Sequence, residues 1–508
     1  MTDSDDRRWW ALGGLMLCLL VVGLDTTILN VALPTMSTAL HASDSDLQWF
    51  SAGCTLVLAA ALLPAGMLGD RYGRKRFLLL ATAAFAAASA ASAYSTSPGM
   101  LIAWRAVMGL AAAFLMSLGL AVLPSLFHGR ERAKAMAVAT TALAAGLPLG
   151  PIVGGALLEH FWWGSVFLIN VPVGAIALVV AGILLPESHS PSHKAIDVIG
   201  VLLSSAGLAG LVYGIIQSSR DGWADPGVIG SLIAGGILIA AFVVWERRTP
   251  RPLVDLSLFA DPAFLWGTVL TTSMNFTVFG LLFIAPQYLQ LVMNNSTLGV
   301  GVRLLPLIGG LIVGARAGNL LVLRIGAKSA VASGFAIIGG GLALGATTGA
   351  TSGYGLVATW FAILGVGMGL VMPTTMDIAL GALTPENSGV GSSALNAVRQ
   401  VGGAFGVALL GSLLNSSYRA GLDTGGLPAA AAHQARRGIG AAAQIAERTG
   451  NRPLLDSARH AFAHGLDVIA LTCTGVALAG IVAAIVFLPH QSETHESRPE
   501  SEDELIAL

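Results

Sequence analysis

Charged residues are scarce in this chain. Only 11% of its 508 residues are Asp, Glu, Lys or Arg, whereas a soluble protein of this size has about a quarter. Neither sign of charge dominates, since 27 basic residues are balanced by 28 acidic ones, so nothing in the composition indicates nucleic-acid binding. The three cysteines, Cys18, Cys54 and Cys473, lie within apolar stretches and offer neither a disulfide framework nor metal-ligand spacing. We therefore predict no metal and no cofactor.

A nucleotide-binding loop is also missing from the sequence. The segment GAKS (326–329) has Ala directly before Lys, where a phosphate-binding loop requires Gly. We therefore do not expect ATP to drive this protein.

Long apolar runs fill most of the chain, which is 55% hydrophobic. A run of about 20 apolar residues crosses a bilayer as a helix. By that rule we predict an all-α membrane protein with fourteen transmembrane helices, at 11–33, 48–68, 77–96, 101–126, 135–158, 165–186, 198–217, 227–245, 263–290, 299–323, 329–348, 354–380, 389–415 and 466–488.

The distribution of Lys and Arg predicts the orientation in the membrane. With both termini in the cytoplasm, most basic residues between the helices fall on the inner side, as the positive-inside rule requires. The connection 417–465 is the exception, because it carries six arginines on the predicted outer side. We predict a multi-pass protein of the plasma or inner membrane with cytoplasmic N- and C-termini.

A short pattern occurs twice and divides the chain into halves. Arg-x-Gly-x-Lys follows the second predicted helix (Arg71, Gly73, Lys75) and the tenth (Arg324, Gly326, Lys328). These places match if the seventh and eighth helices are an insertion, as in a duplicated transporter. The predicted segments are a cytoplasmic N-terminus (1–10), a six-helix bundle (11–186), the inserted pair with its linkers (187–262), a second six-helix bundle with the long outer loop 417–465 (263–488), and an acidic disordered tail (489–508).

Several motifs resemble one known family. GMLGDRYGRKR (66–76) resembles the loop signature of the major facilitator superfamily. Five further segments resemble the fourteen-span drug:proton antiporter subfamily of that superfamily. They are LDTTILNVALP (24–34), GLPLGPIVGG (146–155), FLINVPVG (167–174), PLVDLSLF (252–259) and VGSSALNAVRQVGGAFGVALLGS (390–412). The resemblance implies the major facilitator fold, two six-helix bundles plus two inserted helices. The chain departs from the family where Cys54 and Met108 replace a frequent Tyr and Gln, at positions expected to face the cavity.

The loop signature is a candidate gating element. Its set is Gly66, Asp70, Arg71, Gly73 and Arg74. In the family this loop holds one conformation through a charge network to a nearby helix end, a role that the resemblance gives above all to Asp70 and Arg71. The alternative, which suits Arg74, Lys75 and Arg76 best, is a basic anchor on the inner membrane face.

The fifth predicted helix carries the antiporter motif. Its residues are Gly146, Pro148, Gly150, Pro151, Gly154 and Gly155. Glycines at a spacing of four allow two helices to approach closely, and the prolines bend the helix. The resemblance implies that this motif seals the interface between the halves; close packing alone would also explain the glycines.

An acid, Asp25, lies inside the first predicted helix, and Arg105 lies in the fourth. Burial disfavours a charged carboxyl and a nearby cation favours it. An Asp whose surroundings alternate therefore takes up a proton on one side of the membrane and releases it on the other, and Arg105 could pair with it. The alternatives are a permanently neutral Asp25 bonded to Thr26 or Asn30, and an Arg105 that reaches to the membrane surface.

Asp377, in the twelfth predicted helix, is a second candidate for proton coupling. The alternative is a position near the cytoplasmic helix end, where an acid is easily accommodated. Further candidates for lining the cavity, besides Arg105, are Asn30, Trp49, Phe50, Asn275, Phe279, Phe283, Met376, Asn396 and Arg399.

These features predict a proton-coupled antiporter that exports amphiphilic or cationic drugs. The expected partners are a small amphiphilic substrate, protons and the lipid bilayer, and we expect a functional monomer. Two alternatives stay open: the same mechanism with a narrow endogenous cargo, such as a self-made antibiotic, lipid or siderophore, and a membrane-embedded enzyme or scaffold. The scattered histidines speak against the enzyme, which would need clustered catalytic residues.

Overall fold

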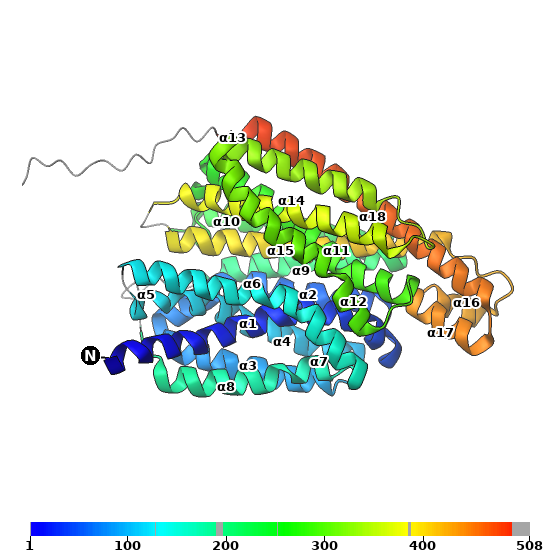
Figure 1. Cartoon of the computed structure of the whole chain (residues 1–508), viewed down its shortest axis with the longest axis horizontal. Coiled ribbons are helices and arrows are strands. Elements are labelled where there is room, and N and C mark those ends of the chain that lie inside the picture. Colours follow the sequence, from blue (N-terminus) through cyan, green and yellow to red (C-terminus); the bar gives the residue numbers. More distant parts are fainter. Residues whose placement is uncertain (1, 128, 189–196, 251, 385–387, 490–508) are drawn as a thin grey trace, which may run out of the picture.

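The computed structural model describes residues 2–127, 129–188, 197–250, 252–384 and 388–489, and this part of the chain is helical throughout (Figure 1). The N-terminal half contains the helices α1 (Thr2–Ala39), α2 (Asp44–Tyr72), α3 (Arg74–Ala93), α4 (Pro98–Ala121), α5 (Leu123–Leu126), α6 (Gly129–His160), α7 (Ser165–Leu168) and α8 (Asn170–Leu184). The inserted pair is α9 (Val198–Asp221) and α10 (Pro226–Arg248).

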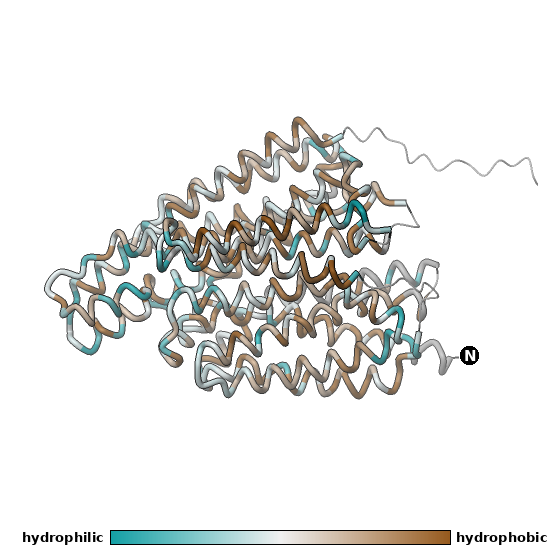
Figure 2. Tube along the Cα trace, turned by 180° about the vertical axis from the view of Figure 1, so that it is seen from behind, coloured by the Kyte–Doolittle hydropathy of each residue, from teal (hydrophilic) through white to brown (hydrophobic). Residues whose placement is uncertain are grey.

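The second half begins after a short 3-10 turn, η1 (Leu256–Ala260). Its elements are α11 (Pro262–Gln287), the π-helical turn η2 (Tyr288–Val292), α12 (Thr297–Arg303), α13 (Leu305–Gly345), α14 (Tyr354–Gly381), α15 (Ser388–Gly421), α16 (Ala429–Ala435), α17 (Ile439–Thr449) and α18 (Arg452–Phe487). Figure 2 shows hydrophobic residues along the long helices, with hydrophilic residues at their ends and over α16 and α17.

Thirteen helical segments of the described chain are long and apolar enough to cross a membrane. They correspond to thirteen of the fourteen predicted spans. The remaining predicted span, 135–158, falls within the 32-residue helix α6. Many side chains of this helix are not among those that the structure describes. The chain is thus an all-α, multi-pass membrane protein.

In both copies of Arg-x-Gly-x-Lys the glycine has a positive φ. Gly73 separates α2 from α3 with a φ of 115°, and Gly326 interrupts α13 with a φ of 80°. L-residues with side chains rarely adopt these angles. The interruption at Gly326 also lies between the two predicted spans that α13 joins. Both copies thus place a glycine where a residue with a side chain would be strained.

Helix α6 packs against the backbone of α1 through its glycine face. A Cβ atom added to Gly146 would overlap the backbone of Gly23 and Leu24, and one added to Gly150 would overlap Thr27. The hydroxyl of Thr27 donates a hydrogen bond to the Gly146 carbonyl, at 3.1 Å. The glycines at a spacing of four therefore allow α6 to lie in close contact with α1. The side chain of Pro148 lies outside the described ones, and Pro151 is buried.

The same motif touches the second half at one end of the bundle. The Thr297 hydroxyl of α12 donates to the carbonyl of Gly155, at 3.1 Å, and a Cβ on Gly301 would overlap the backbone of Pro151. Nearby, the Ser412 hydroxyl of α15 lies 3.4 Å from Oε1 of Gln48 in α2. The short helices α16 and α17 also lie at this end of the bundle, opposite the N-terminus (Figure 1). We call it the hairpin end after this pair of helices.

The connection predicted at 417–465 is largely helical, and the part of it outside the long helices is shorter than predicted. Helix α15 continues to Gly421, α18 already begins at Arg452, and the cap, which we define as residues 422–451, contains α16 and α17. The backbone N–H of Asp44 donates to Arg437 at 3.1 Å, and the Tyr418 hydroxyl donates to Ala435 at 3.2 Å. The cap thus contacts both halves. The predicted tail lies outside the described residues from residue 490 onward.

A single methyl group should disturb the contact between α1 and α6. In Gly146→Ala the new Cβ meets helix backbone, which cannot rotate away, and overpacking of this kind lowers stability by about 1–3 kcal/mol. We expect a lower midpoint of thermal unfolding in detergent. The matched control is Gly236→Ala in α10, where a Cβ would meet nothing within 4 Å. Equal midpoints for the two variants would contradict the close approach.

Candidate functional site

Asp25 and Arg105 form a buried ion pair between α1 and α4. Nη1 of Arg105 lies 2.5 Å from Oδ2 of Asp25, and the two side chains are only 3% and 5% exposed. The guanidinium also donates through Nε to the carbonyl of Phe50 in α2, at 3.0 Å. Arg105 therefore holds three helices together and does not reach the membrane surface, so the alternative of a snorkelling side chain is wrong.

The second carboxylate oxygen of Asp25 faces a series of hydrogen-bonded polar side chains from two further helices. The Asn170 amide of α8 lies 3.4 Å from Oδ1 of Asp25 and donates at 3.0 Å to the Ser89 hydroxyl of α3. That hydroxyl donates in turn to the carbonyl of Phe167. Neither Asn170 nor Ser89 was predicted from the sequence as a site residue. The signal for Asn170 was its place in FLINVPVG, an amide within an otherwise apolar run.

Thr26 and Asn30 do not satisfy Asp25 in this structure. The Thr26 hydroxyl donates to the carbonyl of Val22 at 2.7 Å, and the Asn30 amide lies 3.4 Å from the carbonyl of Thr26. Oδ1 of Asn30 accepts from the Ser51 hydroxyl at 3.1 Å. The partners proposed for a permanently neutral Asp25 are thus engaged elsewhere.

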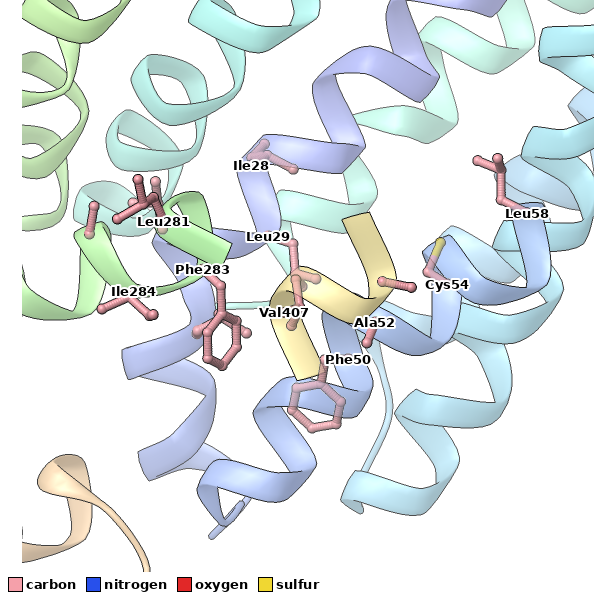
Figure 3. Packing of buried hydrophobic residues seen from close by; sticks show 14 of the residues in the cluster. Ile28, Leu29, Phe50, Ala52, Cys54, Leu58, Leu281, Phe283, Ile284 and Val407 are labelled. Atoms are coloured by element: carbon pink, nitrogen blue, oxygen red, sulfur yellow. The ribbon is translucent and has the colours of Figure 1, made fainter. Parts of the chain in front are cut away.

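A pocket lies beside the ion pair and is bounded by both halves. In this conformation the pocket is narrow, with room for about one water molecule, so a larger molecule fits only when its walls move apart. Its lining residues are Val22, Asp25, Thr26, Leu29, Asn30, Ser51, Cys54, Thr55, Leu58, Phe85, Arg105, Ala112, Phe279, Gln400 and Val407. Figure 3 shows some of the apolar side chains near it, with Leu29 of α1, Cys54 of α2 and Val407 of α15 among them. Polar groups that converge on a mostly apolar wall suit a small-molecule site.

Only some of the predicted cavity residues line this pocket. Asn30, Arg105 and Phe279 do so, together with Asp25, which was predicted for proton coupling. Seven others do not: Trp49, Phe50, Asn275, Phe283, Met376, Asn396 and Arg399. Of the two departures from the family, Cys54 lines the pocket. Met108 is buried outside its lining, with its sulfur 3.5 Å from the Ser92 hydroxyl.

The positions outside the pocket lining have identifiable contacts. The ring of Trp49 lies against Tyr213 of α9, with centroids 6.3 Å apart, and Phe50 and Phe283 are buried in the apolar core. The Asn275 amide donates to the carbonyl of Arg399 at 2.7 Å. The Asn396 amide donates to Ser392 within its own helix, at 2.9 Å.

Asp377 lies apart from Asp25. It is four residues before the end of α14 and its side chain is exposed. This place agrees with the alternative of a helix-end acid. Its neighbour Met376 contacts Arg399, with Nη1 of Arg399 3.8 Å from the sulfur.

In the loop signature Arg74, rather than Arg71, makes the charge network. Nε of Arg74 lies 2.7 Å from Asp70, and its Nη1 donates to the last carbonyl of α4, that of Ala121, at 2.9 Å. The Arg71 guanidinium is exposed and lies 5.2 Å from the ring centre of Tyr72. The expectation that Arg74 is only a basic anchor is therefore wrong for this structure.

The loop glycines have distinct packing roles. A Cβ on Gly66 would meet the Ser117 hydroxyl, and one on Gly69 would overlap Leu118, so α2 and α4 touch here. Gly73 faces the carboxylate of Glu187, which accepts the backbone N–H of Lys75 at 3.0 Å. The contacts of Gly66 and Gly69 lie within the N-terminal half, whereas Glu187 belongs to the linker that follows it.

Comparison with known proteins places this arrangement in a family. The family model described as Major Facilitator Superfamily matches residues 15–407. The tetracenomycin C resistance and export protein of Streptomyces glaucescens is 34% identical, over 97% of this chain and 94% of that protein. The multidrug efflux pump LfrA of Mycolicibacterium smegmatis is 32% identical, over 96% and 97%. The methyl viologen resistance protein SmvA of Salmonella typhimurium is 31% identical, over 90% and 93%.

Solved structures agree on the fold. A bacterial homologue of the human lysosomal transporter Spinster, in an inward-facing and unoccupied conformation, superposes with a TM-score of 0.68 at 16% identity, over 95% of this chain and 98% of that one. The nucleoside transporter NupG superposes with a TM-score of 0.57 at 12% identity. By the family model and these relatives, the chain belongs to the major facilitator superfamily, within its drug and antibiotic efflux transporters.

Proposed function

We propose that the chain is a proton-coupled antiporter that exports amphiphilic drugs or antibiotics across the cell membrane. The observation that carries the proposal is the buried Asp25–Arg105 pair beside the pocket between the halves. The relatives add the class of cargo, because they confer resistance to, or export, small organic molecules.

The ion pair is suited to exchange one proton for one cargo molecule. While Arg105 contacts Asp25, the cation favours the ionised acid. Any movement of α1 relative to α4 that separates them leaves a carboxylate in an apolar interior, where protonation is favourable. Because Asp25 lines the pocket, cargo that displaces Arg105 or its neighbours would change the affinity of Asp25 for a proton.

The contacts between the halves suggest the state of the transport cycle. We assign the hairpin end to the outside and both termini to the cytoplasm, following the distribution of basic residues. The contacts of α6 with α12 and of α2 with α15 then close the outer side. Alternating access requires these contacts to break when the halves rock about the central pocket, with the protein acting as a monomer.

Removal of the acid should abolish coupling. In Asp25→Asn no group at this position can release a proton, so cargo should no longer dissipate a pH gradient. The assay uses purified protein in liposomes with an internal pH-sensitive dye, and ethidium and a neutral amphiphile are added in turn. We expect the cargo-dependent rate to fall by at least about tenfold, as for other residues that carry protons.

The matched control is Asp261→Asn, because Asp261 is an exposed N-cap of α11 and Asn caps helices equally well. It should transport like the wild type. Full coupling in Asp25→Asn would contradict the role of Asp25 and make Asp377 the next candidate. If wild type responds to no compound, the drug-export proposal fails and a narrow cargo has to be sought.

The stability of the same variants tests the ion pair separately. Asp25→Asn leaves a buried guanidinium without its acid, and breaking a buried pair in this way lowers stability by about 3–5 kcal/mol. The double variant Asp25→Asn, Arg105→Gln removes both charges and should recover most of the lost thermal stability without recovering coupling. A double variant that unfolds at the same temperature as the single one would show that the two charges do not compensate each other.

A further inference from the structure

The second half contains a buried arginine whose surroundings differ from those of Arg105. Arg399 of α15 is only 9% exposed, and its Nε has no hydrogen-bond partner among the described residues. Among the described residues its Nη1 contacts a soft acceptor, the sulfur of Met376, at 3.8 Å. The buried guanidinium therefore has N–H groups that could still donate hydrogen bonds.

No carboxylate in the described part of the chain lies within 4.0 Å of Arg399. Asp377 follows Met376 directly, yet its side chain is exposed and makes no ion pair with Arg399. An isolated buried charge is strongly unfavourable, and an ionisable residue in such a position within a membrane protein is a functional candidate. What the position lacks is an anion.

Arg399 lies beside the pocket along α15 but does not line it. The next residue, Gln400, lines the pocket, as does Val407 two turns further on. Between them, a Cβ on Gly403 would meet the ring of Phe279, another lining residue, at 3.1 Å and the Asn275 amide at 3.1 Å. Asn275 holds the backbone carbonyl of Arg399 itself. The pocket's aromatic side chain and Arg399 thus belong to one packed region of α11 and α15.

The charges near the pocket determine which cargo this region suits. Asp25 and Arg105 neutralise each other, so Arg399 contributes the uncompensated charge. We propose that Arg399 binds the anionic group of an aromatic cargo, a carboxylate or an ionised phenol, while the aromatic body lies in the pocket against Phe279. This inference rests on the proposed transport function and specifies its substrate class. A guanidinium suits the role because its donors match two acceptor oxygens at once.

The test compares two probes that differ in one charge, pyrenebutyrate and its uncharged amide. Their binding to purified full-length protein is measured by energy transfer from tryptophan to pyrene, without a pH gradient. We expect the wild type to bind the acid about tenfold more tightly than the amide, as a charged hydrogen bond allows. Arg399→Gln should bind both probes equally, and Arg399→Lys should keep part of the preference for the acid.

The matched control is Arg316→Gln, because Arg316 is an exposed arginine of α13 in the same half; it should keep the full preference. Arg399→Gln should unfold at the same or a higher temperature than the wild type, because it removes a buried charge without an acid partner. The proposal is overturned if the wild type prefers neither probe, if it binds neither, or if Arg399→Gln keeps the preference for the acid. These results are independent of proton coupling, so failure of the antiport assay and failure of the anion site are distinguishable.

Discussion

The ion pair between Asp25 and Arg105 is the constraint on which the N-terminal half depends. Two charges in an apolar interior are tolerated only when their hydrogen bonds are satisfied, and here the partners come from five helices: α1, α2, α3, α4 and α8. Those helices cannot shift independently without exposing a charge to the apolar interior. In the proposed transport cycle the same requirement would make the pair a switch, since protonation of Asp25 would remove the charge that holds the helices together.

The glycine face of α6 complements this polar centre. Gly146 and Gly150 pack against α1 at Gly23, Leu24 and Thr27, immediately around Asp25. Such close backbone contact favours movement of α1 and α6 as one body. Further along α6, Gly155 contacts Thr297 of the other half. One helix therefore connects the surroundings of Asp25 with a contact between the two halves.

The limits of the sequence prediction have physical causes. The spans follow from hydropathy, and Asp25 and Arg105 are conspicuous because charge is rare in apolar runs. Asn170 carries no charge and forms no periodic pattern, so only the fold brings it to Asp25. Arg71 and Arg74 are equally basic, and their roles separate only when α4 offers its terminal carbonyl to one of them. The cap contains short, Ala-rich helices whose few apolar residues are buried against other segments, which local hydropathy does not reveal.

The contrast between the two buried arginines bears on the energetics of transport. Arg105 is neutralised within its own half, whereas Arg399 lacks an acid among the described residues. If the cargo supplies the anion, a proton entering and an anion leaving together move two positive charges inward. One charge moved across 100 mV corresponds to about 2.3 kcal/mol, so two correspond to about 4.6 kcal/mol. A monovalent cation exchanged for one proton would move no net charge and would depend on the pH difference alone. The position of one unpaired guanidinium would thus decide both which molecules bind and whether the membrane potential drives their export.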